Sequence, residues 1–345
     1  MSWRDQLVYP DCKLNAGWVE EKVRKIYSNA RWSDVEIESV SEEGFMAHLR
    51  RMVVTYENED PLVPHNFLVK IPSYNVDWSD SDIQGGSECE DQCGAIIIAN
   101  LTEAENDSYL ILSEYKEKYD LEIPRIFAAI DTRNMAIDES PCLVMEEILD
   151  VHVVNVVDGM NLEQVKSVMA FIVKLQTLSI IEKPANPGVA YEKWEKMPVK
   201  FEEIILGMVR QAKRRFPDKL GPMAERIFEH LYKDMNCSMV KEQAVLGNDG
   251  LSVIAHNDLW TSNLLMDKHD KNKLKCVVDW QATSLGTPTD DLCHVLFACM
   301  STENRRKYFK PLLKHLYEEL VKSVSKHGEQ IPFSYEEYIV GSVIY

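Results

Sequence analysis

Three polar residues that follow a short apolar stretch have the types and the spacing that phosphoryl transfer needs. His256, Asp258 and Asn263 form the pattern H-x-D-x4-N after residues 253–255, and Asp279 ends a second apolar stretch. In such a site one carboxylate orients an attacking hydroxyl and accepts its proton, while an amide oxygen and a second carboxylate hold magnesium against the nucleotide phosphates. Magnesium prefers hard oxygen ligands of this kind. The pattern therefore predicts Asp258 as the catalytic carboxylate, and Asn263 and Asp279 as magnesium ligands.

Three longer motifs around these residues resemble one enzyme superfamily. HNDLWTSN at 256–263, VDWQ at 278–281 and GTPTDDL at 286–292 resemble the choline and aminoglycoside kinase-like superfamily. The most similar branch is that of the CHK kinase-like proteins of animals, which includes ecdysteroid kinases and a large uncharacterised nematode group. The resemblance covers nearly the whole chain and implies an α+β, two-lobed protein-kinase-like fold. It implies a small antiparallel-sheet N-lobe in residues 1–148, and a larger, mainly helical C-lobe in residues 149–345.

The activity that this resemblance implies is a phosphotransferase reaction with an alcohol group as acceptor. ATP and Mg²⁺ would serve as cofactors, and the substrate would be a small metabolite, a steroid or a xenobiotic with a hydroxyl group. An alternative is a catalytically degenerate kinase fold that binds nucleotide or a lipophilic ligand. A protein kinase is disfavoured, because Trp280-Gln281 stands where protein kinases have Phe-Gly and no Ala-Pro-Glu sequence follows. The motifs do not identify the acceptor.

Lys70 and Glu105 are the charged pair expected on the nucleotide side of the site. Lys70 is the one charged residue in the apolar stretch 66–71, and a lysine in such a strand needs a partner. The resemblance implies that Lys70 contacts the α- and β-phosphates and pairs with Glu105. Two plainer interpretations are that Lys70 reaches water from an edge strand and that Glu105 forms a helix-start capping box with Thr102. Glu103 is the alternative acid for the pair.

Two backbone segments are predicted to contact the nucleotide. Residues 35–40 and 45–56 have the pattern of paired strands, and the resemblance places the turn between them, which ends at Gly44, over the phosphates. Because Glu42 and Glu43 in this turn would repel phosphates, an ordinary hairpin turn is an equal alternative. The apolar strand that follows residue 141 resembles the hinge between the lobes. The hinge residues predicted to bind adenine through their backbone groups are Glu146, Glu147 and Ile148.

Three residues are predicted to support the catalytic loop. His256 stands beside apolar residues and is expected to hold the loop by hydrogen bonds. The resemblance implies that Asp291, at a helix start, accepts backbone N–H bonds and braces the loop. Asn257 replaces the glycine common in relatives, and asparagine tolerates left-handed backbone angles better than other non-glycine residues. For Asp258 itself, the plainer alternative is a solvated turn aspartate.

The composition limits the partners and the compartment. The net charge of −18 disfavours nucleic acid and anionic membranes as partners, and no obligatory protein partner is evident. The longest apolar runs, such as residues 95–99, are far shorter than the ~20 residues of a membrane span, and the N-terminus lacks the apolar region of a signal peptide. Because the eight cysteines form no framework, reduced thiols and a cytoplasmic location are expected.

The remaining pattern predicts the other elements and four details that the fold can test. Helical periodicity predicts helices at residues 13–30, 98–117, 162–175, 200–215, 222–233, 292–300 and 302–326. Pro222 is predicted in the first turn of its helix, and Pro311 is predicted to interrupt the last one. Residues 123–127 and 136–137 are predicted to pair as a hairpin. Residues 72–94 are predicted to form a surface loop.

Two further helix starts carry clear signals. Asn161 is a good N-terminal cap, and Ser334 and Glu337 have the spacing of a capping box. The helix opened by Ser334 reaches the end of the chain at Tyr345, whereas the proteins that the chain resembles usually continue with more helix. A shortened isoform or an incomplete gene model is therefore expected, with a final helix that packs incompletely.

Overall fold

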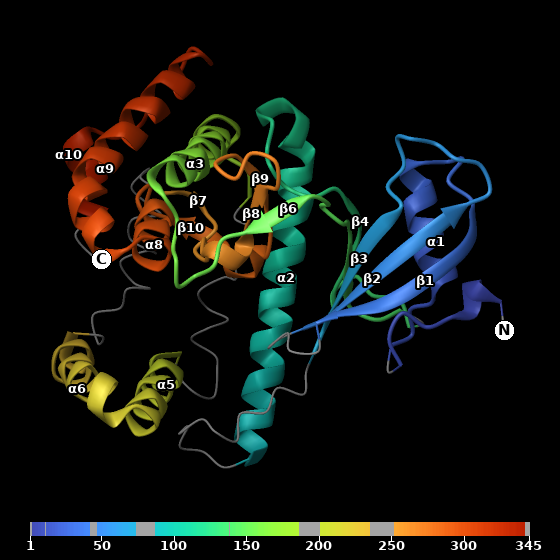
Figure 1. Cartoon of the computed structure of the whole chain (residues 1–345), viewed down its shortest axis with the longest axis horizontal. Helices are drawn as coiled ribbons and strands as arrows, with labels where there is room; N and C mark the ends of the chain where they lie inside the picture. The colour runs from blue at the N-terminus through green and yellow to red at the C-terminus, as the bar shows by residue number, and fades with distance from the viewer. Residues whose placement is uncertain are drawn as a thin grey trace.

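The computed structural model describes most of the 345 residues, and all structural statements concern these parts of the chain (Figure 1). The described ranges are 2–10, 12–41, 47–73, 87–137, 139–185, 201–234 and 252–341. The predicted nucleotide-covering turn with Glu42, Glu43 and Gly44 lies outside them, as does the end of the chain after residue 341. The molecule has an α+β fold, with an antiparallel sheet followed by a mainly helical part, as predicted.

The first half of the chain contains a five-stranded antiparallel sheet with the strand order β1-β2-β3-β5-β4. Its strands are β1 (Trp32–Ser41), β2 (Ala47–Tyr56), β3 (Asn66–Pro72), β4 (Ile126–Ile130) and β5 (Cys142–Glu146). Alternate residues of β3 are buried, as expected for a strand that packs on one face. Helix α1 (Ala16–Ile26), capped by Asn15, buries Val19 and Val23 against the sheet residues Trp32, Met52 and Phe67.

The hairpin that contains β4 differs from the sequence prediction. β4 pairs with β5, and the predicted partner, residues 136–137, lies in the connection between them, where Ile137 is 93% exposed. The connection turns at Asp131, whose N–H donates to Asn134 Oδ1 at 2.8 Å. Polar side chains that satisfy local backbone groups in this way favour a turn over a strand.

Helix α2 (Ser87–Tyr119) crosses the whole molecule between the sheet and the helical part (Figure 1). It begins before residue 94, so the predicted loop over residues 72–94 is too long and the helix predicted at 98–117 is too short. Thr102 lies inside the helix, where its hydroxyl donates to the carbonyl of Ile98 at 2.8 Å. The alternative interpretation of Thr102 as a helix cap is therefore wrong.

The second half of the chain combines helices with two small sheets. Its helices are α3 (Leu162–Glu182), α5 (Phe201–Arg215), α6 (Pro217–Asp234), α8 (Asp290–Cys299), α9 (Thr302–Ser325) and α10 (Tyr335–Gly341). The short strands are β6 (Val151–Val153), β7 (Val253–Ala255), β8 (Leu264–Asp267), β9 (Leu274–Val277) and β10 (Ser284–Gly286), paired as β6-β8-β9 and β10-β7. The predicted caps are confirmed: Asn161 and Gln164 exchange side-chain bonds to each other's backbone N–H, and so do Ser334 and Glu337.

Two prolines lie inside helices rather than at the predicted boundaries. Helix α6 begins at Pro217, so Pro222 is interior and not in the first turn. Helix α9 continues through Pro311 without interruption. A proline removes one N–H donor and crowds the preceding turn. In α9 this local cost is outweighed by packing, because Leu312, Leu313 and Leu316 are buried directly after it.

Helix α3 is, among the described residues, the one helix long and apolar enough to match a membrane span by length and composition, a match that the sequence prediction missed. Of its most apolar window, 56% is buried inside the molecule. Val165, Val168 and Phe171 belong to the larger hydrophobic core, together with residues of α2, α8 and α9. A core helix has the same apolar composition.

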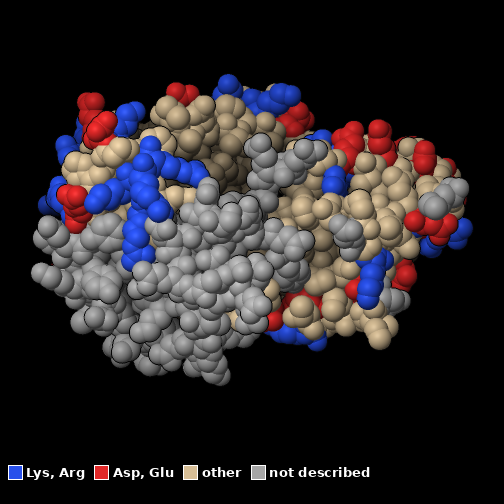
Figure 2. Space-filling model, turned by 90° about the horizontal axis from the view of Figure 1, so that it is seen from below, with Lys and Arg blue, Asp and Glu red and all other residues tan. Residues whose placement is uncertain are grey.

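Figure 2, which views the molecule from below, shows both acidic and basic side chains on the described surface.

Candidate active site

The predicted catalytic loop, residues 256–263, begins where the buried strand β7 ends, and its turn contains a residue with left-handed backbone angles. Asn257 has φ +63°, a conformation that costs most non-glycine residues energy and that asparagine adopts more readily. Its amide Nδ2 donates to the carbonyl of Ala282 at 3.1 Å and to the hydroxyl of Ser284 at 2.8 Å. The side chain thus fixes the strained turn against the neighbouring strand β10.

Asp291 braces the same loop from the first turn of α8. Its Oδ2 accepts the backbone N–H of His256 at 3.0 Å, and its Oδ1 accepts that of Asn257 at 2.9 Å. The carboxyl group is buried, and burial raises its pKa to about 7. The structure therefore gives Asp291 the supporting contacts that the sequence predicted.

His256 holds the loop with both ring nitrogens. Nε2 lies 3.1 Å from the carbonyl oxygen of Val278, and Nδ1 accepts the backbone N–H of Asp258 at 3.2 Å. These contacts assign the neutral tautomer that carries its proton on Nε2. Burial lowers the pKa of His256 to about 4, which agrees with a neutral ring. His256 therefore connects the catalytic loop to the segment that ends at Asp279.

Asp258 and Asn263 face each other across the catalytic loop. Asn263 Nδ2 donates to the backbone carbonyl of Asp258 at 2.9 Å and to its Oδ2 at 3.0 Å. The side chain of Asp258 is 33% exposed, and burial raises its pKa although nearby His294 acts in the opposite direction. A partly exposed carboxylate with a raised pKa suits a general base.

His294 is a site residue that the sequence interpretation missed. Its Nε2 lies 3.8 Å from Asp258 Oδ1, the oxygen that Asn263 does not contact. The signal was present in the sequence, because residues three apart share one helix face. If Asp291 faces the catalytic loop from α8, then His294 must face it too.

Asp279 is brought next to Asn263 by strand pairing. Leu264 of β8 pairs with Val277 of β9, and the N–H of Val278 donates to the carbonyl of Asn263 at 3.1 Å. The two predicted magnesium ligands therefore leave the same end of one hairpin. Asp279 itself has φ +67° and ψ +66°, which is a left-handed backbone for a non-glycine residue.

Lys70 links Asp279 to helix α2. Its Nζ lies 2.8 Å from Glu105 Oε2 and 2.7 Å from Asp279 Oδ1. Burial by itself would lower the pKa of Lys70, but the attraction of Glu105 and Asp279 raises it, so the ammonium stays charged. The predicted ion pair is present, whereas Glu103, the alternative acid, lies 3.9 Å from Arg133.

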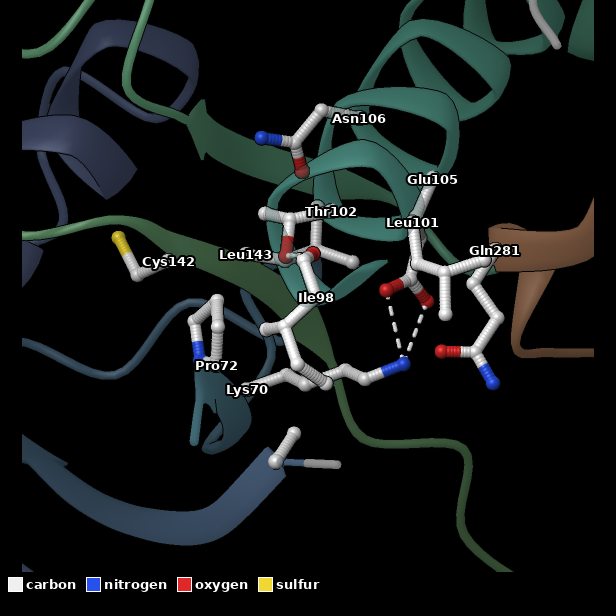
Figure 3. A pocket seen from close by; sticks show the side chains of 11 residues that line it. Lys70, Pro72, Ile98, Leu101, Thr102, Glu105, Asn106, Cys142, Leu143 and Gln281 are labelled. Atoms are coloured by element: carbon white, nitrogen blue, oxygen red, sulfur yellow. Dashed lines mark hydrogen bonds and ion pairs between the residues drawn. The ribbon is translucent and has the colours of Figure 1, made fainter. Parts of the chain in front are cut away.

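A small cavity lies beside this ion pair (Figure 3). Its volume is about 20 Å³, which is room for about one water molecule and far too little for a nucleotide. Figure 3 shows Lys70 reaching from β3 towards Glu105, with Gln281 from the segment after Asp279 alongside. The cavity that the described residues enclose therefore does not by itself mark a nucleotide site.

The predicted hinge is tied to the sheet. The N–H groups of Glu146 and Glu147 already donate to the carbonyls of Arg125 and Asn66, at 2.9 and 3.1 Å. The carboxylate of Glu147 accepts two bonds from Arg51, from Nε at 2.9 Å and Nη2 at 2.6 Å. The side chain of Glu147 thus forms an ion pair with Arg51 of β2, a contact that the sequence interpretation missed. Because the N–H groups of Glu146 and Glu147 are already bonded within the sheet, the predicted backbone donor to adenine would be the N–H of Ile148.

The donor atoms near Asp258 fit magnesium held jointly with phosphates. Asn263 uses its amide nitrogen on Asp258, which leaves its carbonyl oxygen, and Asp279 Oδ2 has only a long 3.4 Å contact from Gln281. Both are hard oxygen donors. Among the described residues, no group of three or more His, Cys, Asp and Glu side chains could hold a metal ion alone. A metal here would need phosphate oxygens and water to complete its coordination.

Fold and site together define an α+β protein with a Lys–Glu–Asp ion cluster next to an Asp–Asn catalytic loop. Residues 22–339 match the model of the DUF1679 family, described as "Uncharacterized oxidoreductase dhs-27", and the chain belongs to this family. The Caenorhabditis elegans protein "Uncharacterized oxidoreductase dhs-27" is 21% identical to it over 94% of the chain and 40% of that protein. A second C. elegans protein, "Uncharacterized kinase-like protein D1044.1", is 32% identical over 25% of the chain and 21% of its own length. The chain thus spans less than half the length of these relatives.

Two solved structures have a limited similarity to the chain. The GDP and kanamycin complex of APH(2")-IIia is 12% identical, with a TM-score of 0.41 over 88% of this chain and 86% of that one. Choline kinase LicA from Streptococcus pneumoniae is 14% identical, with a TM-score of 0.37 over 95% of this chain and 98% of that one. At TM-scores below 0.5, any inference about function has to come from the residues of the site.

Proposed function

We propose that the chain is an ATP- and magnesium-dependent small-molecule kinase of the CHK kinase-like branch, with Asp258 as its general base. The observation that carries the proposal is the meeting of five side chains from distant parts of the sequence. Lys70 comes from β3, Glu105 from α2, Asp258 and Asn263 from the loop after β7, and Asp279 from the end of β9. A lysine, two metal-binding oxygens and a separate carboxylate are the parts that phosphoryl transfer to a hydroxyl uses.

In the proposed reaction, a hydroxyl of the acceptor approaches the partly exposed carboxylate of Asp258. A bond forms between the acceptor oxygen and the γ-phosphorus, the bond from that phosphorus to the ADP oxygen breaks, and the hydroxyl proton passes to Asp258. The products are a phosphate monoester and ADP. Lys70 contributes positive charge to the phosphates, and its place is maintained by Glu105. When bound, magnesium would neutralise phosphate charge beside Asn263 and Asp279.

Two features of the site support Asp258 rather than another acid as the base. Asp279 Oδ1 is engaged by the Lys70 ammonium at 2.7 Å, and the carboxylate of Asp291 is buried under two backbone N–H groups. The Asn263 amide bonds to Oδ2 of Asp258 and not to Oδ1, and the Asp258 side chain is 33% exposed. It is thus the carboxylate of the loop that an acceptor can reach.

The proposal extends to the organisation of the whole chain. Residues 1–148 would form the nucleotide-binding lobe and residues 149–345 the catalytic and substrate lobe, in a cytoplasmic enzyme that needs no nucleic acid, membrane or obligatory protein partner. The word oxidoreductase stands in the description of the DUF1679 family model and in the name of a relative of which the chain matches 40%. The sequence contains no G-x-G-x-x-G dinucleotide-binding pattern. A kinase therefore explains the residues of this chain better than an oxidoreductase.

The test is a screen for a phosphorylated product. The protein is incubated with MgATP and a panel of hydroxylated metabolites, sterols and glycosides, and products are detected by mass spectrometry, with the Asp258→Asn variant as the matched control. The expected result is a product heavier by one phosphoryl group with the wild type and far less with the variant. MgATP binding without product from any acceptor would favour a nucleotide-binding protein without transferase activity.

A further inference from the structure

The hydroxyl of Tyr109 contacts the backbone of the metal-binding segment. It accepts the N–H of Asp279 at 3.3 Å, across 170 residues of sequence. Tyr109 is fully buried in α2, and burial raises its pKa well above the usual value, so it remains a neutral phenol. Its ring packs edge-on against Trp280, with centroids 6.4 Å apart. The residue is thus fixed on both its polar and its apolar side.

The backbone that Tyr109 contacts needs such support. Asp279 has φ +67°, and this left-handed backbone is strained for a non-glycine residue. Such strain persists only where the surroundings determine it. The side chain of Asp279 is held by Lys70, but that contact has to change when phosphates bind to Lys70. The Tyr109 hydroxyl is the backbone contact that does not depend on the nucleotide.

Tyr109 lies one helical turn after Glu105, on the same face of α2, because residues four apart are neighbours on a helix. Glu105 holds the side chain of Lys70 at 2.8 Å, and Tyr109 holds the backbone of Asp279. One face of one helix therefore supports both the residue proposed for the phosphates and the residue proposed for the metal.

We propose that Tyr109 is a positioning residue for Asp279, and that α2 through Glu105 and Tyr109 keeps the phosphate contact and the metal contact at a fixed separation. This inference rests on the proposed nucleotide site but goes beyond it. It assigns the metal affinity of the site in part to a residue that touches neither metal nor nucleotide. The loss of one hydrogen bond of this kind changes affinity by about threefold to tenfold.

The test compares Tyr109→Phe with Tyr115→Phe, a matched change on the same helix. Calorimetry with ATP plus MgCl₂, and with ATP plus EDTA, measures the two affinities separately. Tyr109→Phe should weaken binding of MgATP about threefold to tenfold and metal-free ATP less than about twofold, and Tyr115→Phe should change neither. Equal loss of both affinities would mean a merely structural role and would overturn the inference, as would unchanged MgATP binding.

Hydrogen exchange gives a second readout that needs no nucleotide. In Tyr109→Phe the amide of Asp279 should exchange faster than in the wild type, while α2 keeps its protection. Unchanged exchange at Asp279 would overturn the positioning role. Absence of MgATP binding in the wild type would instead overturn the proposed function, so the two failures are distinguishable.

Discussion

The two halves of the candidate site are held in different ways. The catalytic loop around Asp258 is fixed by hydrogen bonds from buried groups, among them the Asp291 carboxylate and the His256 ring. Lys70 is held by opposite charges from elements 35 and 209 residues away. The loop contacts are therefore made within the protein, whereas in the proposed reaction Lys70 would exchange part of its contact with Glu105 and Asp279 for phosphate. The half of the site that contains Asp258 is thus expected to be rigid, and the half that contains Lys70 is expected to rearrange when a nucleotide binds.

The largest expected effect is on the rigid half. Asp258→Asn keeps the size of the side chain but removes most of its proton affinity, so phosphate transfer should fall by about 10²–10⁴-fold. Because the fixed loop keeps its geometry, MgATP affinity should change less than about twofold. Single-turnover transfer to the acceptor found by screening, with calorimetry alongside, measures both. A variant that transfers phosphate at the wild-type rate would remove Asp258 from the mechanism.

The brace of the loop should depend on pH. Burial raises the pKa of Asp291 from 3.8 to about 7 in the folded state, so ionisation of this carboxyl costs folding stability as pH rises from about 4 to about 7. Asp291→Asn does not ionise. As the pH rises from about 4 to about 7, the wild type should therefore lose stability relative to Asp291→Asn. The free energy of unfolding of the wild type minus that of the variant should fall by up to about 4 kcal/mol, at about 1.4 kcal/mol per pKa unit.

Urea denaturation of the wild type and Asp291→Asn across this pH range makes the measurement. His256 is buried with a pKa of about 4 and titrates in both proteins, so its contribution largely cancels in the difference. Parallel stability curves would show that the Asp291 carboxyl is not forced to ionise against its burial.

The charged half should respond more weakly to a single change. Glu105→Gln removes one of the two carboxylates on Lys70 but leaves Asp279 in place, so the KM for ATP should rise about tenfold with a smaller change in kcat. Glu103→Gln is the matched control, since Glu103 lies on the same helix but near Arg133. Steady-state kinetics on the two variants decides. A larger rise in the KM for ATP with Glu103→Gln than with Glu105→Gln would show that Glu105 is not the functional partner of Lys70.

The smallest expected effect concerns the strained turn. Asn257 has φ +63° and donates to Ala282 and Ser284. Asn257→Ala and Asn257→Gly both remove these bonds, but only alanine keeps the steric cost of the left-handed backbone. After the greater flexibility of the unfolded glycine chain is included, the glycine variant should be more stable by about 0.5–1 kcal/mol. Chemical denaturation tests this, and a more stable alanine variant would contradict it.

Much of the site was visible in the sequence where its geometry is local. His256, Asp258 and Asn263 lie within eight consecutive positions, so their spacing alone indicates a shared loop. The contacts Arg51–Glu147 and Tyr109–Asp279 were not predicted. Their residues lie 96 and 170 positions apart, respectively, and no sequence periodicity relates such distant positions. The early start of α2 was missed for a different reason. Residues 87–94 are polar and acidic and directly follow Gly85-Gly86, and this composition indicated a surface loop.

Helix α2 has a mechanical consequence for the nucleotide site. Its 33 residues span about 50 Å at 1.5 Å per residue, and its second half buries Tyr109, Leu112 and Tyr119 in the larger core beside α3. A helix anchored there cannot swing outward without opening that core. Any displacement of the five-stranded sheet relative to this helix would therefore act on the ion pair between Lys70 of β3 and Glu105 of α2. A molecule that holds the sheet away from α2 would separate the pair, whereas one that pulls on the helix would meet the resistance of the whole core.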